Sequence, residues 1–268
     1  FPTYMMTERP DNVSRALLEG KIAITVDTSP YVILLPAFLA DFINPGVDQY
    51  NKNKNVNFIK ILRFVCFFLS MIAPAIYIAL TNYNQETIPT DLLVSFAVQR
   101  DGVPFPAIVE AFMMLFICEM LRESDIRFPN SYGSAISILG ALVLGDAAVS
   151  AGIVSQIMII VIALTFISSL IFTEVELVSA LRHLRFIFLI WASFYGIMGI
   201  VFGLFYFLIR INDTYSFGKP YFYPIVPFDK TYLYKTLLKS RAKKDTKRSK
   251  LLTKKNFTRQ GENAWKNY

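Results

Sequence analysis

The chain has 268 residues and a net charge of +7, and 54% of its residues are hydrophobic, with a mean hydropathy of +0.44. This composition is typical of integral membrane proteins and excludes an ordinary soluble domain. The two cysteines stand in apolar runs without CxxC spacing and histidine occurs once, so we expect no disulfide framework and no Cys/His metal site. The sequence also lacks the common phosphate-loop, zinc-protease and nucleophile-elbow motifs, so we expect no enzyme and no cofactor.

The positive charge is concentrated at the C-terminal end. Residues 235–268 contain twelve Lys or Arg against two acidic residues. A basic tail beside a membrane segment is typical of the cytoplasmic side and of contact with anionic lipid. Nucleic acid is the competing partner for such a run, but no nucleic-acid-binding motif accompanies it. We therefore predict a cytoplasmic tail that contacts anionic lipid, and no nucleic-acid partner.

Residues 1–30 predict a small α/β element at the N-terminus, the end of a soluble domain next to the membrane. An extended start leads to a short helix, with Asp11 as its N-cap and Gly20 as its stop. Lys21–Asp27 alternates in the manner of a strand and ends in turn residues. The apolar run Tyr31–Ile43 is too short to span a bilayer, so an interfacial or re-entrant segment is expected there.

Longer apolar segments follow, and they predict an all-α transmembrane domain over 31–215. The basic stretch 52–63 and the basic tail both favour the cytoplasmic side, which requires an even number of crossings between them. One segment should therefore not span fully, and the segment that carries two glutamates is the best candidate. We predict about four transmembrane helices plus re-entrant or interfacial helices. The apolar segments are 57–83, 105–121, 133–152, 155–172 and 186–211.

Two further stretches lie outside these apolar segments. Residues 84–104 read as a polar connection that ends in a turn at 101–104. Residues 216–234 begin with a stretch rich in proline and aromatic side chains, which is typical of an ordered interfacial segment rather than a helix. Residues 235–268 then form the basic tail.

The stretch Gly133–Ser155 is long enough to cross a bilayer, and its two faces differ. Small residues every fourth position let helix backbones approach closely within a membrane. The opposite face carries a carboxylate, which is costly against lipid and should meet protein or water. The packing face is Gly133, Ser137, Ala141 and Gly145, and the opposite face is Leu139, Val143, Asp146 and Ser150.

The membrane carboxylates admit two interpretations. If copies of the chain surround an axis, the Asp146 face could line a pore, with Leu and Val as an apolar gate and a ring of Asp146 favouring cations. Alternatively, Asp146 is protonated or paired inside a packed bundle. Glu110 and Glu119 are nine residues apart and point in opposite directions from one helix, so at least one needs a partner, an interface or a water-lined cavity. Each belongs either to a structural ion pair or hydrogen bond, or to an ion or proton route.

The chain resembles the membrane region of the A subunits of GerA-type spore germinant receptors, a family that includes SpoVAF. The resemblance runs nearly end to end, and it implies that a large N-terminal soluble domain precedes the part seen here. The stretches that carry it are TERPDNVSRALLEGKIAITVD, PAIYIALTNY, IPTDLL, GVPFPAIVEA, EMLRESDIRFP, SILGALVLGDAAVSAGIVS, LRHLRF and SFGKPYFYP.

The resemblance also implies a location and partners. It implies a multi-pass protein of the inner membrane of the bacterial spore, assembled into a ring with five as the expected copy number. A permease-like B subunit that binds the nutrient and a lipoprotein C subunit are the expected partners. The stretch Val143–Val149 matches the pore-lining helix that is assumed for the family, which adds Val149 to the predicted ion pathway.

Two hypotheses of function remain open at this stage. The first is a subunit of an oligomeric, nutrient-gated cation channel that triggers spore germination. The second is a non-conducting scaffold that holds the permease-like partner and transmits its signal. A secondary transporter would favour inverted repeats with paired broken helices, and the sequence contains no such internal repeat.

Overall fold

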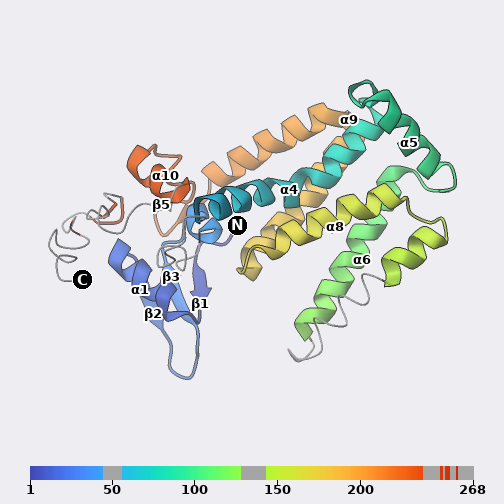
Figure 1. Ribbon diagram of the computed structural model, residues 1–268. Coiled ribbons are helices and arrows are strands. Elements are labelled where there is room, and N and C mark those ends of the chain that lie inside the picture. Colours follow the sequence, from blue (N-terminus) through green and yellow to red (C-terminus); the bar gives the residue numbers. More distant parts are fainter. Residues whose placement is uncertain (45–55, 128–142, 238–247, 250, 254–257, 259–268) are drawn as a thin grey trace. The chain divides into compact units, whose positions relative to one another are not determined.

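The computed structural model describes most of the chain, and within that part it is mainly helical with two small antiparallel sheets (Figure 1). The chain divides into two compact units. Unit 1 comprises residues 1–65, 172–180 and 206–268, and unit 2 comprises residues 66–171 and 181–205. The described residues are 1–44, 56–127, 143–237, 248–249, 251–253 and 258.

Unit 1 opens with a short strand and a helix. Strand β1 is Met5–Thr7 and helix α1 is Pro10–Glu19. Gly20 ends the helix in the left-handed region with φ of 92°, which confirms the predicted stop because glycine adopts this conformation without a steric cost. The predicted N-cap was wrong: Arg9 occupies that position, since Pro10 forms the first turn, and Asp11 lies inside it.

The sheet of unit 1 contains the segment that sequence analysis placed at the membrane interface. Strand β2 is Ile22–Thr25, as predicted, and β3 is Val32–Leu35. The order β1-β3-β2 makes β3 the middle strand, antiparallel to both neighbours. Residues 32–35 of the run Tyr31–Ile43 thus form a strand of a sheet, and its interfacial location stays a prediction. A short aliphatic run between turn residues also fits a half-buried strand. Pairing with β1 and β2 makes this run a strand.

The C-terminal part of unit 1 contains a tight hairpin and a short helix. The strands β4 (Tyr215–Ser216) and β5 (Lys219–Pro220) pair, and the helix α10 is Lys230–Leu237. Residues 221–228 are not helical, as predicted. The Tyr221 ring is fully buried, and its backbone oxygen accepts a hydrogen bond from the amide of Leu39, which begins helix α2 (Leu39–Ile43). The two ends of the described chain thus share one core.

Unit 2 is built from helices. Helix α4, Val56–Asn82, begins in unit 1 and continues into unit 2 with Pro74 inside it, and α6 is Ala107–Arg127. Both agree with predicted apolar segments. Between them lie the 3-10 turn η1 (Gln85–Thr87) and helix α5 (Thr90–Arg100), where a polar connection was expected. The packed core of unit 2 includes Ile78, Leu115, Met158, Ile162 and Leu189.

The segment 143–150 is helical and forms a hairpin with helix α8, Gln156–Leu170. Gly152 has a φ of 65°, and the amide of Ile153 turns back to bond the oxygen of Ala148. A Cβ placed on Gly145 would lie 3.9 Å from the side chain of Ile159, so the two helices lie close together. The predicted tight hairpin is confirmed for the described residues.

Helix α9, Val175–Asn212, reverses its direction at Gly196, whose φ of 59° and ψ of −136° are not helical. The rings of Trp191 and Phe202 have centroids 6.5 Å apart, and a Cβ on Gly203 would lie 2.6 Å from the Phe188 ring. Phe188 and Gly203 are fifteen residues apart, and on a straight helix they would be separated by about 22 Å. The chain therefore folds back on itself, and its two arms meet in orange beside the α9 label (Figure 1). Sequence analysis predicted one apolar segment over 186–211, and the structure divides this segment into two arms at Gly196.

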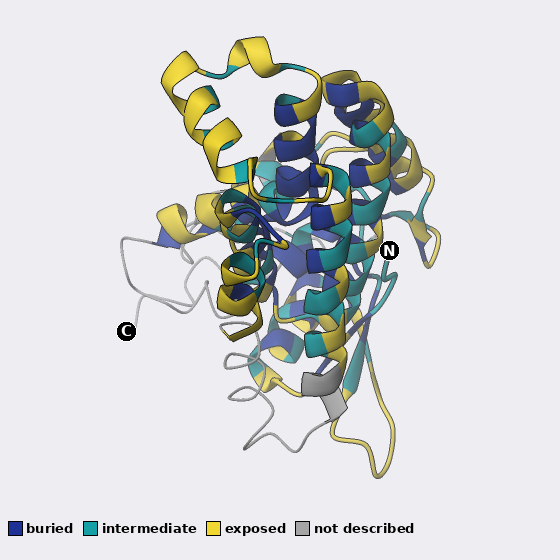
Figure 2. Cartoon of the chain, turned by 90° about the vertical axis from the view of Figure 1, so that its right-hand side faces the viewer, coloured by how far each residue is buried: buried dark blue, intermediate teal, exposed yellow. Residues whose placement is uncertain are grey.

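Two of the described helices are long and apolar enough to cross a membrane, judged by length and composition alone. They are α4, with a mean hydropathy of 2.2, and α9, with a mean of 2.1, while α8 is apolar but shorter. The predicted number of about four spans is thus not confirmed. Many large apolar side chains are exposed, including Phe194, Ile160 and Ile209, and yellow covers the outer faces of several helices in Figure 2. Exposed apolar surface of this extent is typical of lipid or protein contact.

The reversal at Gly196 gives a first prediction. A side chain at this φ costs about 1–3 kcal/mol, and its Cβ would also lie 2.8 Å from the Cβ of Tyr83. Gly196→Ala should therefore lower the thermal unfolding midpoint by several degrees, measured by intrinsic fluorescence in detergent. Gly102→Ala is the matched control, because no atom lies within 4 Å of its added Cβ, and it should change the midpoint little. Equal midpoints for both variants would contradict the reversal.

Candidate functional site

The helical segment 143–150 presents two different faces. Val143, Asp146 and Ser150 are exposed, Val149 is half-buried, and Gly145 is buried on the side of α8. The 3.6-residue period of the helix accounts for this division, because Gly145 lies about 100° from Asp146. Of the residues predicted for the pore face and the packing face, Leu139, Gly133, Ser137 and Ala141 lie outside the described residues.

Within the described part of the chain, the Asp146 carboxylate has neither an ion-pair partner nor a hydrogen bond. Its exposure leaves its charge available to solvent or to another molecule. Ala148, two residues further on, lies against the core cluster of unit 2. Gly145 and Ala148 thus pack inward within the chain, whereas Asp146 is exposed.

Glu110 is fully buried and holds the start of helix α8. Its Oε2 accepts hydrogen bonds from the backbone amide and the hydroxyl of Ser155, both at 2.9 Å. Ser155 is the N-cap of α8, where free amides and the helix dipole favour a negative charge. The Oε1 atom lies 3.7 Å from Nη2 of Arg100 at the end of α5. One carboxylate therefore connects three helices.

Glu119 lies on the opposite side of α6 and faces α9. Its Oε2 accepts a hydrogen bond of 2.7 Å from Nη1 of Arg182, and its Oε1 lies 4.0 Å from Nη1 of Arg185. The Nε of Arg185 donates to the backbone oxygen of Ser70 on α4 at 2.8 Å. The predicted opposite directions of Glu110 and Glu119 are confirmed, and each carboxylate has a partner inside unit 2.

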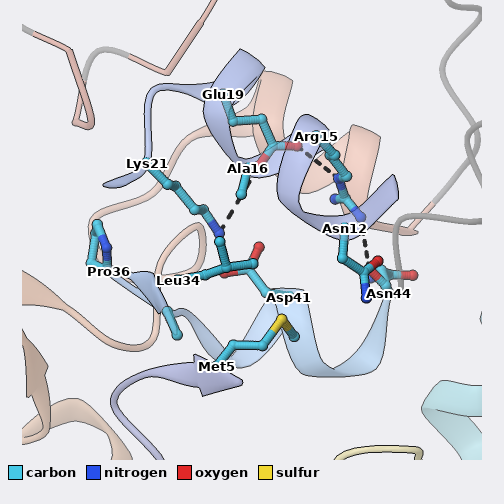
Figure 3. A pocket seen from close by; sticks show the side chains of 11 residues that line it. Met5, Asn12, Arg15, Ala16, Glu19, Lys21, Leu34, Pro36, Asp41 and Asn44 are labelled. Atoms are coloured by element: carbon cyan, nitrogen blue, oxygen red, sulfur yellow. Dashed lines mark hydrogen bonds and ion pairs between the residues drawn. The ribbon is translucent and has the colours of Figure 1, made fainter. Parts of the chain in front are cut away.

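Unit 1 contains a cluster of buried charges that sequence analysis did not single out (Figure 3). Nζ of Lys21 lies 2.5 Å from Oδ2 of Asp41 and 4.0 Å from Glu19. Arg15 donates from Nε to Glu19 at 2.9 Å and from Nη1 to the backbone oxygen of Asn44 at 2.8 Å. Two cations face two anions, so the cluster is balanced in charge and connects α1 to α2.

The environment of Arg15 favours its charged form. Burial acts most strongly on Arg15 and would lower its pKa, but Glu19, Tyr232 and Asp41 outweigh burial and raise the pKa above its usual value. Burial, followed by the charge of Glu19, raises the pKa of Tyr232 well above its ordinary range. The Tyr232 hydroxyl therefore stays protonated and donates to Glu19 at 3.2 Å.

The cavity beside this cluster is small. Its volume is about 30 Å³, and apolar side chains such as Met5 and Leu34 share its lining with the charged groups. A cavity of this size has room for about two water molecules. An amino acid or a sugar does not fit, so the cluster has the character of a structural ion network.

Comparison with known proteins identifies the family. A family model described as Bacillus/Clostridium GerA spore germination protein matches residues 1–251. The chain belongs to this family. No grouping of His, Cys, Asp and Glu that could hold a metal ion occurs among the described residues of this GerA family member. No solved structure matches the chain.

Curated relatives within the GerA family include three from Bacillus subtilis strain 168. Spore germination protein KA is 43% identical over 98% of this chain and 48% of its own length. Uncharacterized membrane protein YfkQ is 42% identical over 85% of this chain and 44% of its own length. Spore germination protein A1 is 38% identical over 84% of this chain and 46% of its own length. The chain thus spans about half the length of the curated relatives it matches.

Sequence analysis of this GerA family member identified the membrane carboxylates but not their partners. Arg100 was placed in the polar connection 84–104, and Arg182 and Arg185 lie between the apolar segments 155–172 and 186–211. The spacing of Arg182 and Arg185 does carry a signal, since residues three apart share a helix face. That face could have been matched to Glu119 only with the packing of α6 and α9 known. Lys21 and Asp41 likewise meet only because the sheet and α2 fold together.

The ion network of unit 1 gives a second prediction. Asp41→Asn leaves the buried Lys21 ammonium without its nearest partner, which costs about 3–5 kcal/mol in comparable pairs. The thermal unfolding midpoint should therefore fall substantially. Asp11→Asn is the matched control, because the Arg9–Asp11 pair is partly exposed and should contribute about 0–1 kcal/mol. A loss for Asp41→Asn no larger than for the control would refute the structural role.

Proposed function

We propose that this chain is the membrane part of a subunit of an oligomeric, nutrient-gated cation channel that triggers spore germination. Its membership of the GerA spore germination family and its similarity to several spore germination proteins support the biological process. Two long apolar helices and a relative named as a membrane protein support a membrane location. The inner membrane of the spore is the site we propose, with a multi-pass topology and the basic tail on the cytoplasmic side.

The channel proposal rests on a difference among three carboxylates: two have partners within unit 2 and one is exposed. Glu110 and Glu119 are engaged by neighbouring groups of the same unit. Asp146 is exposed and has no such partner among the described residues. An unpaired acid in an apolar segment is costly against lipid, so it favours contact with water or with another subunit. A water-filled axis provides such contact.

Oligomerisation is part of this proposal, because the helices of one copy are too few to enclose a pore. Copies arranged around an axis would place Val143, Asp146 and Ser150 toward its centre, with Leu139 and Val149 completing the pathway. Valine and leucine side chains give a constriction that closes by dewetting, and a ring of carboxylates favours cations. We propose a closed ring, with five copies as the expected number.

The nutrient is proposed to bind elsewhere in the assembly. The cavity beside the charged cluster of unit 1 has room only for water. A permease-like B subunit is therefore the proposed binding partner, and a lipoprotein C subunit completes the proposed receptor. Anionic lipid is the proposed contact of the basic tail, which holds twelve Lys or Arg against two acids.

The channel proposal predicts distinct effects for two substitutions. Asp146→Asn removes the charge from the proposed ring, so the preference for cations over anions should fall several-fold without loss of conductance. Val143→Ala widens the proposed constriction, so conductance without a trigger should rise. Reversal potentials in planar bilayers, with the reconstituted receptor, measure the first effect, and untriggered ion flux from liposomes measures the second.

Asp213→Asn is the control for these measurements, since Asp213 is also exposed but follows the end of α9. It should leave both selectivity and leak unchanged. A receptor that forms rings by mass but conducts no ions under any trigger would reject the channel. The subunit would then be a non-conducting scaffold, and Asp146→Asn would alter only assembly or stability.

A further inference from the structure

Three arginines gather around one glutamate where the apolar helices of unit 2 become polar. Glu119 and Arg122 lie on α6, and Arg182 and Arg185 lie on α9. Arg122 donates from Nη2 to the hydroxyl of Ser169 near the end of α8 at 3.0 Å, and its guanidinium lies over the Phe166 ring. Arg122 and Arg182 both lie close enough to Arg185 to act on it electrostatically. We call these three arginines the arginine cluster.

The arginine cluster contains buried donors without acceptors. Among the described residues, Nε of Arg182 and Nη2 of Arg185 are buried and make no hydrogen bond. The Arg185 side chain is only 3% exposed, and its other contacts are the Ser70 oxygen and the more distant Glu119. A buried donor without an acceptor costs about 1–3 kcal/mol, and more when it is charged. These donors therefore favour an additional oxygen ligand.

The charge of the arginine cluster favours an anion. Glu119 faces the guanidinium groups of both Arg182 and Arg185, so positive charge exceeds negative charge among these three side chains. Glu123 and His183, on the adjacent turns, are exposed and have contacts of their own. Guanidinium groups bind phosphate oxygens through paired N–H donors, a geometry that ammonium groups cannot provide. Arg182 and Glu119 are 21% and 22% exposed, so the cluster is open on one side and ends at the buried Arg185.

We propose that the arginine cluster binds a phosphate group, and that an anionic phospholipid headgroup supplies it. The location favours this source. Arg122 of α6 and Ser169 of α8 are in contact here, as are Glu119 of α6 and Arg182 of α9, and apolar stretches give way to polar residues at these positions. Basic pockets between membrane helices at the headgroup level bind anionic lipids. No residue of the basic tail, 235–268, belongs to the arginine cluster.

Native mass spectrometry of the full chain purified in detergent tests this site. The protein is mixed with phosphatidylglycerol, with phosphatidylcholine or with inorganic phosphate, and the mass of the retained adduct identifies the ligand. Phosphatidylglycerol should be retained more strongly than phosphatidylcholine. Arg182→Gln and Arg122→Gln, both at partly exposed positions, should each weaken its binding about tenfold. Glu119→Gln removes the competing carboxylate and should strengthen binding several-fold, which a purely structural role would not produce.

Arg210→Gln is the matched control, because Arg210 is an exposed arginine over the Tyr206 ring at the other end of α9. It should bind phosphatidylglycerol as the unmodified chain does. Retention of inorganic phosphate but not of phosphatidylglycerol, with loss in Arg182→Gln, would support the anion site and overturn the lipid as its source. Equal binding of phosphatidylglycerol by Arg182→Gln and Arg210→Gln would overturn the site itself.

Discussion

The packing of unit 2 depends on one constraint, which is that a carboxylate within apolar helices must have a partner. Glu110 meets this constraint at the N-terminus of α8, and Glu119 meets it at two arginines of α9. Because the two glutamates lie on opposite sides of α6, satisfying both requires a helix on each side. The apolar contacts of unit 2 have no such directionality. The ionic contacts therefore determine which helix ends lie next to α6.

The reversal of α9 changes the number of membrane crossings expected between the two basic regions. A single span over 186–211 would give an odd number of apolar segments between two cytoplasmic basic regions. A hairpin adds an even number of crossings, whether it enters the membrane part-way or crosses it twice. The segments 57–83, 105–121, 133–152 and 155–172 then supply an even number by themselves. The charge rule consequently no longer requires the segment with Glu110 and Glu119 to be excluded from the spans.

Sequence patterns predicted those elements whose cause is local. The long apolar runs at 57–83 and 105–121 became helices because their length and composition suffice. Gly20 ends α1 because glycine alone accepts its φ at no cost. Other features depend on distant residues. The run that became β3 is a strand because two other strands pair with it, and α9 turns at Gly196 because its second arm packs against Phe188. No periodicity within these segments encodes those contacts.

The candidate site also combines features with a local cause and features that depend on distant residues. The helical period assigned Asp146 and Gly145 to different faces, and the structure exposes one and buries the other. The directions of Glu110 and Glu119 also followed from the period. Their partners did not, because Arg100, Arg182 and Ser155 are distant in the chain or follow a turn. A pattern can indicate where a charge points, but tertiary packing decides what it meets.

The ion network of unit 1 and the arginine cluster of unit 2 differ in a way that distinguishes a structural role from ligand binding. In unit 1, Arg15 and Lys21 face Glu19 and Asp41, and the adjoining cavity has room only for water. Positive and negative charge balance there, so an added ion would gain little and would disturb paired groups. In unit 2, Arg182 and Arg185 both face Glu119, and among the described residues two of their buried guanidinium donors lack acceptors. An added anion there would find both a surplus of charge and free hydrogen-bond donors. Charge balance and donor satisfaction, rather than the presence of charged residues, therefore distinguish a network that supports the fold from one suited to a ligand.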